Sequence, residues 1–142
     1  EVYYEIVRKG NLLFPDLTPL LASINTNYPT AIATNSGRSD AREVFAATGL
    51  EEYFDLSFTA DDVENMKPAP DMYLLAAKEL GVEPTESIVC EDSPAGIAGA
   101  RAAGCYIIGI TSSQTADKLH QADEIVEDSA TAFRRVLELL EA

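Results

Sequence analysis

The segment from Ser87 to Ile97 constrains the fold of this chain more than any other stretch of its sequence. Residues 88–90 form a short apolar run, which is typical of a buried strand in a parallel sheet. Ser93 then fits a helix N-cap, and Pro94 fits the first helical position, where its missing N–H removes no intrahelical hydrogen bond. The segment therefore predicts a strand, a tight turn and a helix in immediate succession.

The helix expected over residues 95–103 consists almost entirely of small residues, so it can lie close to a sheet, and Gly104 fits the position after its last turn. Two adjacent acids, Glu91 and Asp92, separate the expected strand from the helix. Carboxylates that end a strand at the mouth of a parallel sheet suit a hard cation such as Mg²⁺. In the alternative interpretation, Asp92 only begins a turn and Glu91 is solvated.

Apolar periodicity and turn residues divide the remaining chain into alternating strands and helices. Strands are expected at residues 30–33, 56–59, 106–110 and 124–126. Helices are expected through residues 20–24 with Asp16 or Thr18 as the cap, and over residues 39–48, 71–80 and 129–140; residues 25–29 are expected to turn. Residues 1–7 fit either a helix or a strand. This alternation predicts an α/β fold, with a parallel sheet covered by helices on both faces.

Length and charge narrow the possible partners. The 142 residues suit one domain, and a net charge of −14 argues against non-specific nucleic-acid binding. A phosphorylated substrate must then be attracted by a local cation. No apolar run approaches the ~20 residues of a membrane span, and the layout of a signal peptide is missing. Cys90 and Cys105 lie in apolar runs, so buried thiols and a reducing cytoplasm are expected.

Three polar loops are expected at the edge where parallel sheets bind ligands. Thr34 and Asn35 can offer a hydroxyl, an amide and backbone N–H groups to a phosphate near a helix start, or can simply cap that helix. Lys67 is a cation on a stiff, proline-rich loop, although a lone lysine is usually solvated. Together with Glu91 and Asp92, these residues are the parts that phosphoryl transfer needs.

Three motifs together resemble the haloacid dehalogenase (HAD) superfamily: Thr34-Asn35, Lys67-Pro68-Ala69-Pro70-Asp71 and Glu91-Asp92-Ser93-Pro94-Ala95-Gly96-Ile97. The branch that they resemble most contains β-phosphoglucomutase and the small sugar-phosphate and phosphoglycolate phosphatases. The resemblance implies a HAD-type Rossmann-like core. It also implies that Thr34, with Asn35 beside it, binds the transferring phosphoryl group. Lys67 would join that group to the nucleophile, and Glu91 with Asp92 would form the Mg²⁺ site.

The sequence departs from the family at its beginning. Family members start with a strand that ends in Asp-x-Asp-Gly, whose first aspartate is phosphorylated, and this motif does not occur here. Residues 12–18 only imitate it, because they lack the second aspartate and the glycine. The resemblance therefore identifies residues 1–11 as the tail of a cap-domain helix and linker, and residues 12–142 as the C-terminal part of the core. The first core strand and most of the cap are expected to be absent.

Two functional hypotheses follow. In the first, the chain is a portion of a Mg²⁺-dependent phosphatase or phosphomutase for a small phosphorylated metabolite such as a sugar phosphate, inactive alone because the nucleophile lies upstream. The resemblance places specificity in the cap, so phosphatase and phosphomutase both stay open. In the second, it is a non-catalytic domain that binds phosphate, metal or a protein partner. The absent strand would leave an unpaired edge in the sheet, so one of three outcomes is expected: the missing N-terminal segment completes the sheet, a second chain does, or the chain is poorly folded. The first is the outcome that we expect most.

Overall fold

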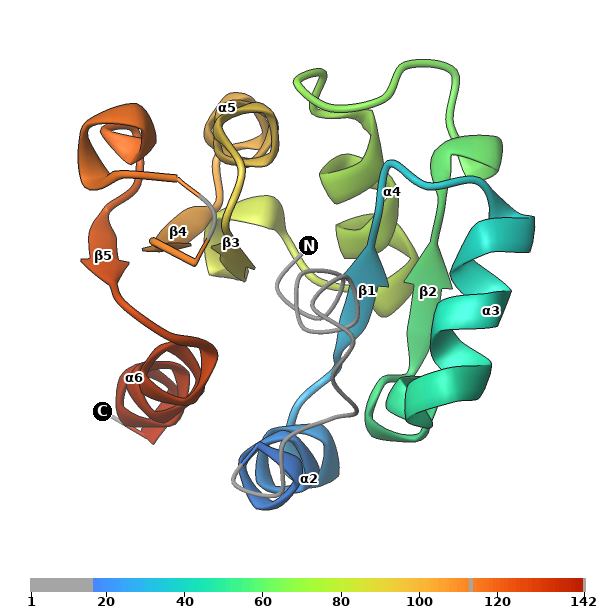
Figure 1. Cartoon of the computed structure of the whole chain (residues 1–142), viewed down its shortest axis with the longest axis horizontal. Helices are drawn as coiled ribbons and strands as arrows, with labels where there is room; N and C mark the ends of the chain where they lie inside the picture. Colours follow the sequence, from blue (N-terminus) through green and yellow to red (C-terminus); the bar gives the residue numbers. More distant parts are fainter. Residues whose placement is uncertain (1–16, 113, 142) are drawn as a thin grey trace.

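A parallel β-sheet in two parts runs through the computed structural model, which describes residues 17–112 and 114–141 (Figure 1). One part pairs β1 (Ala31–Ala33) with β2 (Leu56–Phe58), and the other pairs β3 (Ile88–Glu91), β4 (Tyr106–Ile110) and β5 (Glu124–Val126) in that order. Every pairing is parallel; for example, Ile88 lies opposite Tyr106 and Ala31 opposite Leu56. The predicted α/β class and the parallel sheet are confirmed.

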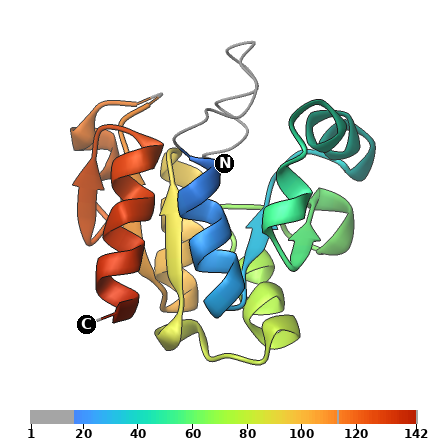
Figure 2. The same ribbon diagram turned by 90° about the horizontal axis from the view of Figure 1, so that it is seen from below.

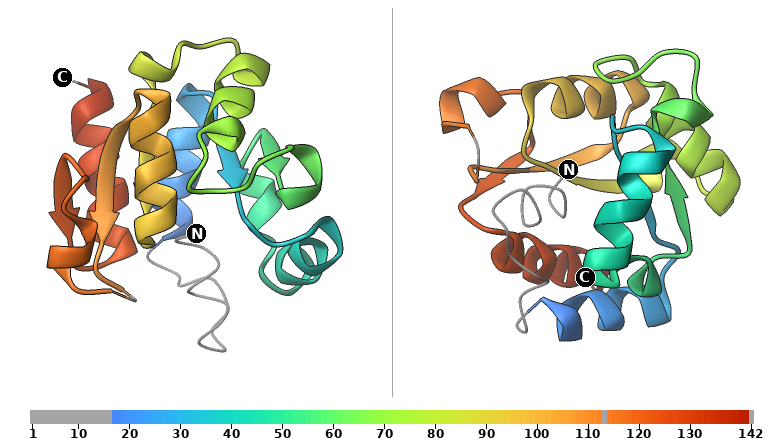
Figure 3. Two further views of the ribbon diagram at one scale, coloured as in Figure 1. Left: turned by 90° about the horizontal axis from the view of Figure 1, so that it is seen from above. Right: turned by 45° about the vertical axis from the view of Figure 1, so that its right-hand side comes forward.

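Helices cover both faces of this sheet, as predicted. The α-helices are α2 (Thr18–Asn27), α3 (Arg38–Thr48), α4 (Asp71–Leu80), α5 (Pro94–Ala103) and α6 (Ser129–Glu141), and the 3₁₀ turns are η1 (Leu50–Tyr53), η2 (Ala60–Asp62), η3 (Pro84–Glu86) and η4 (Ala116–Leu119). Helices α2 and α6 lie side by side on one face, and α4 and α5 lie on the other (Figures 2 and 3). No helix in the described part of the chain has both the length and the apolar composition to cross a membrane.

The core follows from the two-residue alternation of β4. Ile107 points to the α5 face, where it packs with Ile97, while Ile108 points to the opposite face and packs with Val136 of α6. All of these side chains except Val136 are at most 1% exposed, because β4 has a strand on either edge and helices on both faces. The middle of the larger half-sheet is therefore a closed apolar core.

The helix ends obey the local rules that the sequence suggested. Ser93 is the N-cap of α5 and its hydroxyl accepts a hydrogen bond from the N–H of Gly96. Gly104 ends the same helix with φ of 92°, a left-handed conformation that glycine adopts without strain. Asp128 accepts a hydrogen bond from the N–H of Thr131 at the start of α6, as a capping aspartate does.

Some predicted boundaries are wrong. Helix α2 begins at Thr18 with Leu17 in the N-cap position and no side-chain cap, so Thr18 is the first helical residue rather than the cap. The helix also continues to Asn27, so residues 25–27 are helical and do not form the predicted turn. The side chains of Thr26 and Asn27 donate hydrogen bonds to backbone carbonyls four residues earlier in the helix. The alternative cap Asp16, the helix or strand expected over residues 1–7 and the boundary between residues 11 and 12 lie outside the described residues.

Strands β1 and β3 are the neighbouring edges of the two half-sheets, but they are not hydrogen-bonded to each other. Among residues 17–112 and 114–141, no strand lies between them. The expectation that the first core strand of the HAD fold is absent stays a prediction. The carboxyl ends of β1 and β3 nevertheless lie on the same side of the molecule, toward the upper edge in Figure 2.

Candidate functional site

Buried polar side chains gather at the carboxyl ends of β1 and β3. The buried polar or charged residues of the described part of the chain are Thr34, Thr59, Lys67, Glu91 and Asp92. All but Thr59 are residues that the sequence analysis placed in the site. Lys67 is 5% exposed and Glu91 1% exposed, so the alternatives in which these two side chains are solvated are wrong.

Lys67 and Glu91 form a buried ion pair. The distance from Nζ of Lys67 to Oε2 of Glu91 is 2.9 Å, and each side chain is 1% exposed. The same Oε2 accepts a hydrogen bond of 3.0 Å from the hydroxyl of Tyr73 on α4, and the Lys67 ammonium lies 5.3 Å from the centre of the Tyr73 ring. Lys67 also donates to the carbonyl oxygen of Ala33 at 3.0 Å, which ties the loop to the end of β1.

The charge of Lys67 favours the ionised form of Glu91. Burial by itself would raise the pKa of the Glu91 carboxyl, because a low-dielectric interior disfavours the charged form. The positive charge of Lys67 and the hydrogen bonds from Lys67 and Tyr73 act in the opposite direction and contribute to a pKa below the usual range of a glutamate. Glu91 is therefore an ionised carboxylate at neutral pH.

The second oxygen of Glu91 is also used within the protein. Oε1 accepts hydrogen bonds from the N–H groups of Asp92 at 3.0 Å and Ser93 at 3.2 Å, and from the Ser93 hydroxyl at 3.1 Å. This carboxylate lies against Gly96 of α5, where an added Cβ would come within 2.1 Å of the Glu91 carboxyl carbon. The small residues of α5 thus allow the helix to pack directly on the acid.

Asp92 is the acid that is better placed to bind a cation. It is 4% exposed, and the hydroxyl of Ser112 donates to its Oδ2 at 3.4 Å. Glu91 accepts donors of the protein on both of its oxygens, so a metal there would compete with them. In the described residues no three histidine, cysteine, aspartate or glutamate side chains converge as a metal site would need. The role of Glu91 and Asp92 as Mg²⁺ ligands stays a prediction.

The loop after β1 supports the loop that carries Lys67. Oδ1 of Asn35 accepts from the N–H of Lys67 at 3.1 Å, and Nδ2 donates to the Lys67 carbonyl at 3.3 Å. Thr34 is 1% exposed, and its hydroxyl accepts from the N–H of Ser36 at 3.1 Å. The N-cap of α3 is Gly37, so the interpretation of Thr34 and Asn35 as a plain helix cap is wrong. Phosphate binding by these two residues stays a prediction.

Comparison with known proteins defines the family. Residues 1–104 match the hydrolase family described as haloacid dehalogenase-like hydrolase. The chain belongs to this family. Its match to the family begins in residues 1–16 and extends through all three predicted site loops, to the end of α5.

Curated relatives of the chain are phosphatases. The chain is 43% identical over 94 residues to the fructose-1-phosphate phosphatase YqaB of Escherichia coli (strain K12), which covers 66% of this chain and 50% of that protein. It is 38% identical over 100 residues to the validoxylamine A 7′-phosphate phosphatase of Streptomyces hygroscopicus subsp. limoneus, covering 70% of this chain and 47% of that protein. The chain therefore spans about half the length of these relatives.

Solved structures of HAD proteins share the fold. A HAD hydrolase of family IA, variant 3, from Entamoeba histolytica has a TM-score of 0.79 at 30% identity, covering 99% of this chain and 66% of that chain. The β-phosphoglucomutase of Clostridium difficile has a TM-score of 0.74 at 26% identity, covering 96% and 61%. Both agree with the HAD-type core that the motifs implied.

Sequence reasoning missed three contributors to the site of this HAD-like chain. Tyr73 was not distinguished from other apolar residues of its helix, because only the fold brings its hydroxyl to Glu91. Ser112 follows β4 and reaches Asp92 across 20 residues of sequence. Thr59 follows β2 and forms a capping box with Asp62; a threonine followed by an acid three positions later was the available signal.

Proposed function

We propose that this chain carries the phosphate-binding and cation-binding part of a Mg²⁺-dependent HAD phosphatase or phosphomutase that acts on a small phosphorylated metabolite such as a sugar phosphate. The observation that supports this most is the buried cluster of Thr34, Lys67 and Asp92 with Glu91, at the edge where parallel sheets bind ligands. The name of the E. coli relative denotes a phosphatase for a sugar phosphate. The substrate class proposed here follows that relative.

The charge of the cluster favours a divalent cation. One lysine and two carboxylates leave one net negative charge at the site, in a chain whose net charge is −14. A phosphate monoester dianion would be repelled by this site, and Lys67 is already neutralised by Glu91. A divalent cation bound at Asp92 reverses the local sign, and Mg²⁺ prefers such carboxylate oxygens together with waters and substrate phosphate.

Each residue then has a distinct part in the reaction. The Thr34 hydroxyl, with Asn35 beside it, binds the oxygens of the transferring phosphoryl group. Lys67 holds that group against the attacking atom, and Glu91 keeps the ammonium in position from behind. Asp92, supported by Glu91, holds Mg²⁺, which when bound neutralises charge on the phosphate oxygens.

The nucleophile in this proposal comes from polypeptide outside the chain. A carboxylate oxygen attacks phosphorus, the bond from phosphorus to the ester oxygen breaks, and the leaving alcohol takes a proton. Water then hydrolyses the aspartyl-phosphate in a phosphatase, or a second substrate hydroxyl accepts the phosphoryl group in a phosphomutase. Residues 1–142 alone should therefore show negligible turnover.

A hybrid enzyme tests this proposal. The chain is joined to the half of the E. coli fructose-1-phosphate phosphatase that it does not match, and hydrolysis of an aryl phosphate is measured with and without Mg²⁺. We expect Mg²⁺-dependent turnover in the hybrid, a loss of at least about 10²-fold in Lys67→Ala, and little change in Lys78→Ala, an exposed lysine on α4. Robust turnover by the 142-residue chain alone, or full activity of the Lys67→Ala hybrid, would contradict the assignment.

We also infer a cytoplasmic setting. Cys90 and Cys105 are free thiols, one half-buried and the other buried. Burial raises the pKa of the Cys90 thiol to about 12, so it stays protonated and unreactive at neutral pH. Free thiols of this kind are usual in a reducing compartment.

A further inference from the structure

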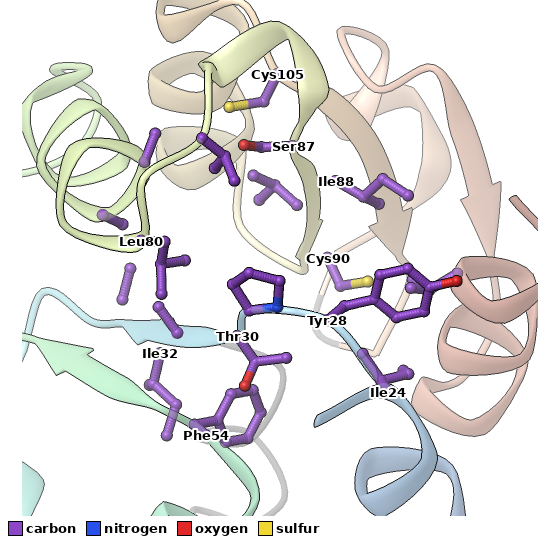
Figure 4. A pocket seen from close by; sticks show the side chains of 18 of the residues that line it. Ile24, Tyr28, Thr30, Ile32, Phe54, Leu80, Ser87, Ile88, Cys90 and Cys105 are labelled. Atoms are coloured by element: carbon purple, nitrogen blue, oxygen red, sulfur yellow. The ribbon is translucent and has the colours of Figure 1, made fainter. Parts of the chain in front are cut away.

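The candidate site is built from two half-sheets that are not hydrogen-bonded to each other within the described residues. A cavity of about 430 Å³ lies between them, and Figure 4 shows Thr30 and Ile32 on one side of it, with Ile88 and Cys90 on the other. The loops of the proposed phosphate ligands follow β1 and β2, whereas the proposed cation ligands lie at the end of β3. The position of the two phosphate-binding loops relative to each other is therefore set on the β1–β2 side.

Arg38, the first residue of α3, connects these loops through its side chain. Its guanidinium donates to the hydroxyl of Ser57 at 3.1 Å, to the carbonyl oxygen of Ser57 at 3.3 Å, and to the carboxylate of Asp62. The side chains of Arg38 and Asp62 are 30% and 33% exposed, so solvent screens the pair only in part. A planar guanidinium holds several acceptors at once in fixed directions. Arg38 thus ties the start of α3 to β2 and to η2.

Residues of η2 bond back to the start of α3. Oδ2 of Asp61 accepts from the backbone N–H of Arg38 at 2.8 Å, so an acid of η2 binds the first turn of a helix whose own N-cap is a glycine. The N–H of Ala60 donates to the carbonyl of Ser36 at 3.0 Å. We call Arg38, Asp61 and Asp62 the loop clamp, because hydrogen bonds run through them in both directions between α3 and η2.

Asp62 is charged in the loop clamp. Its Oδ2 accepts from the N–H of Thr59 at 2.7 Å, directly after β2. Burial by itself would raise the pKa of the Asp62 carboxyl, but the hydrogen bond from the Thr59 N–H and the positive charge of Arg38 outweigh burial and hold that pKa below its ordinary value of 3.8. The ion pair between Arg38 and Asp62 is therefore present at neutral pH.

The loop clamp lies between the two loops that carry the proposed phosphate ligands. Thr34 and Asn35 come just before Arg38 in the sequence, and the loop of Lys67 follows Asp62. The two loops also touch directly, because the N–H of Lys67 donates to Oδ1 of Asn35 at 3.1 Å. They are thus held together at two places, once at the clamp and once beside the ammonium-bearing residue.

We propose that Arg38 is a positioning residue of this site: through the loop clamp it holds the loop after β1 against the loop of Lys67. The proposal rests on the proposed function, which makes these two loops the ligands of the transferring phosphoryl group. Arg38 spends its donors on Ser57 and Asp62 and acts without touching the phosphate. Its loss leaves every phosphate ligand present but misplaced, and a misplacement of about 1 Å can cost about 10²-fold in rate.

Amide hydrogen exchange of the full chain, followed residue by residue by NMR, tests the clamp without any enzymatic reaction. Arg38→Met removes the charge and the donors but keeps an unbranched side chain. We expect exchange at the amides of Lys67 and Ala60 to become at least about tenfold faster, because their acceptors lie on the segment that Arg38 anchors. Exchange at Tyr106, whose N–H donates to the Ser87 carbonyl in the other half-sheet, should not change.

Two further variants separate the clamp from a general effect of charge. Arg42→Met is the matched control, because Arg42 is an exposed residue of the same helix, and it should leave exchange unchanged. Arg38→Lys keeps a positive charge beside Asp62 but lacks the planar fork, so we expect intermediate exchange at Lys67. If Arg38→Met fails to fold, the comparison of Arg38→Lys with Arg42→Lys decides in the same way.

The hybrid enzyme supplies the test of positioning. Arg38→Met should lower kcat at least about tenfold with little change in KM, because the ligands are present but misaligned. A higher KM at unchanged kcat would mean that Arg38 binds the substrate itself, which contradicts the proposal, and so would an unchanged kcat beside faster exchange at Lys67. A hybrid that is inactive without any substitution counts against the proposed function alone, and amide exchange then decides on the clamp.

The exchange experiment overturns the proposal if Lys67 and Ala60 exchange as slowly in Arg38→Met as in the unaltered chain. It also does so if exchange at Tyr106 rises by the same factor, because Arg38 would then only stabilise the fold as a whole. An equal effect of Arg42→Met would contradict the proposal too, since the charge of α3 and not the clamp would be responsible.

Discussion

The neighbouring strands β3 and β4 differ in how deeply their apolar side chains are buried. On β4, Ile107, Ile108 and Ile110 are fully buried. On β3, Ile88, Val89 and Cys90 are only half-buried, whereas its last residue, the charged Glu91, is 1% exposed. The difference arises because β4 has strands on both edges, whereas β3 pairs on one edge only among the described residues and lines the cavity between the two half-sheets. The ionic end of β3 is thus fully enclosed while its apolar middle is not.

This contrast shows that polar partners enclose Glu91, whereas the apolar residues that precede it on β3 are only half-buried. Lys67, Tyr73 and the start of α5 enclose the acid, and both Glu91 and Tyr73 also line the cavity between the two half-sheets.

The largest effect is expected from removing the cation of the buried pair. Lys67→Ala leaves Glu91 charged and unpaired in the interior, which should reduce the free energy of unfolding by about 3–5 kcal/mol. Arg135→Ala, which removes a partly exposed partner of Glu124, should reduce it far less. Urea unfolding of both variants measures the difference, and equal losses would show that the pair is not as enclosed as described.

Truncation of isoleucines on the two strands tests the contrast directly. Ile108→Ala on β4 should reduce the free energy of unfolding by about 2–5 kcal/mol, since it opens a cavity in a closed core. Ile88→Ala on β3 should reduce it by about half as much or less, because the side chain is already half-exposed. Equal costs would contradict the comparison.

A smaller loss is expected from Gly96→Ala in α5. The new methyl group would lie 2.1 Å from the Glu91 carboxyl carbon, so the helix or the acid must shift, at a cost of about 1–3 kcal/mol. Gly37→Ala is the matched control, because its Cβ would meet only an Asp61 oxygen at 3.6 Å. Thermal unfolding should show a lower midpoint for Gly96→Ala alone, and an unchanged midpoint would mean that Glu91 can move freely.

The smallest effect is expected from the protonation of Glu91, which changes the stability of the chain only at acidic pH. Its pKa is lowered in the folded state from an ordinary value of 4.5, so the unfolded state binds the proton more readily. The stabilisation is complete above pH 4.5 and is lost as the pH falls from there through the folded pKa. Urea unfolding between pH 6 and pH 3 should therefore show a shallower acid loss for Glu91→Gln than for the unaltered chain. Parallel pH profiles would show that Glu91 does not titrate with unfolding.

Local sequence rules predicted the position of β3 and both ends of α5 well. Ser93, Pro94 and Gly104 act through backbone groups within a few residues, so their roles can be read without the fold. The boundaries of α2 were not predictable in this way. Its first residue is set by Leu17, which is 1% exposed and packs in the core instead of forming a cap.

The sequence by itself determined the α/β class, the HAD resemblance and the residues that meet at the site, because ordered motifs at strand ends converge in any parallel sheet. Only the tertiary structure decided whether Glu91 is solvated or buried. Its partners Lys67 and Tyr73 lie 24 and 18 residues away in the sequence, and the packing of α4 against α5 brings them to it. The same holds for the cavity between the two half-sheets: β1 and β3 are two ordinary apolar strands in the sequence, and only the fold places them opposite each other.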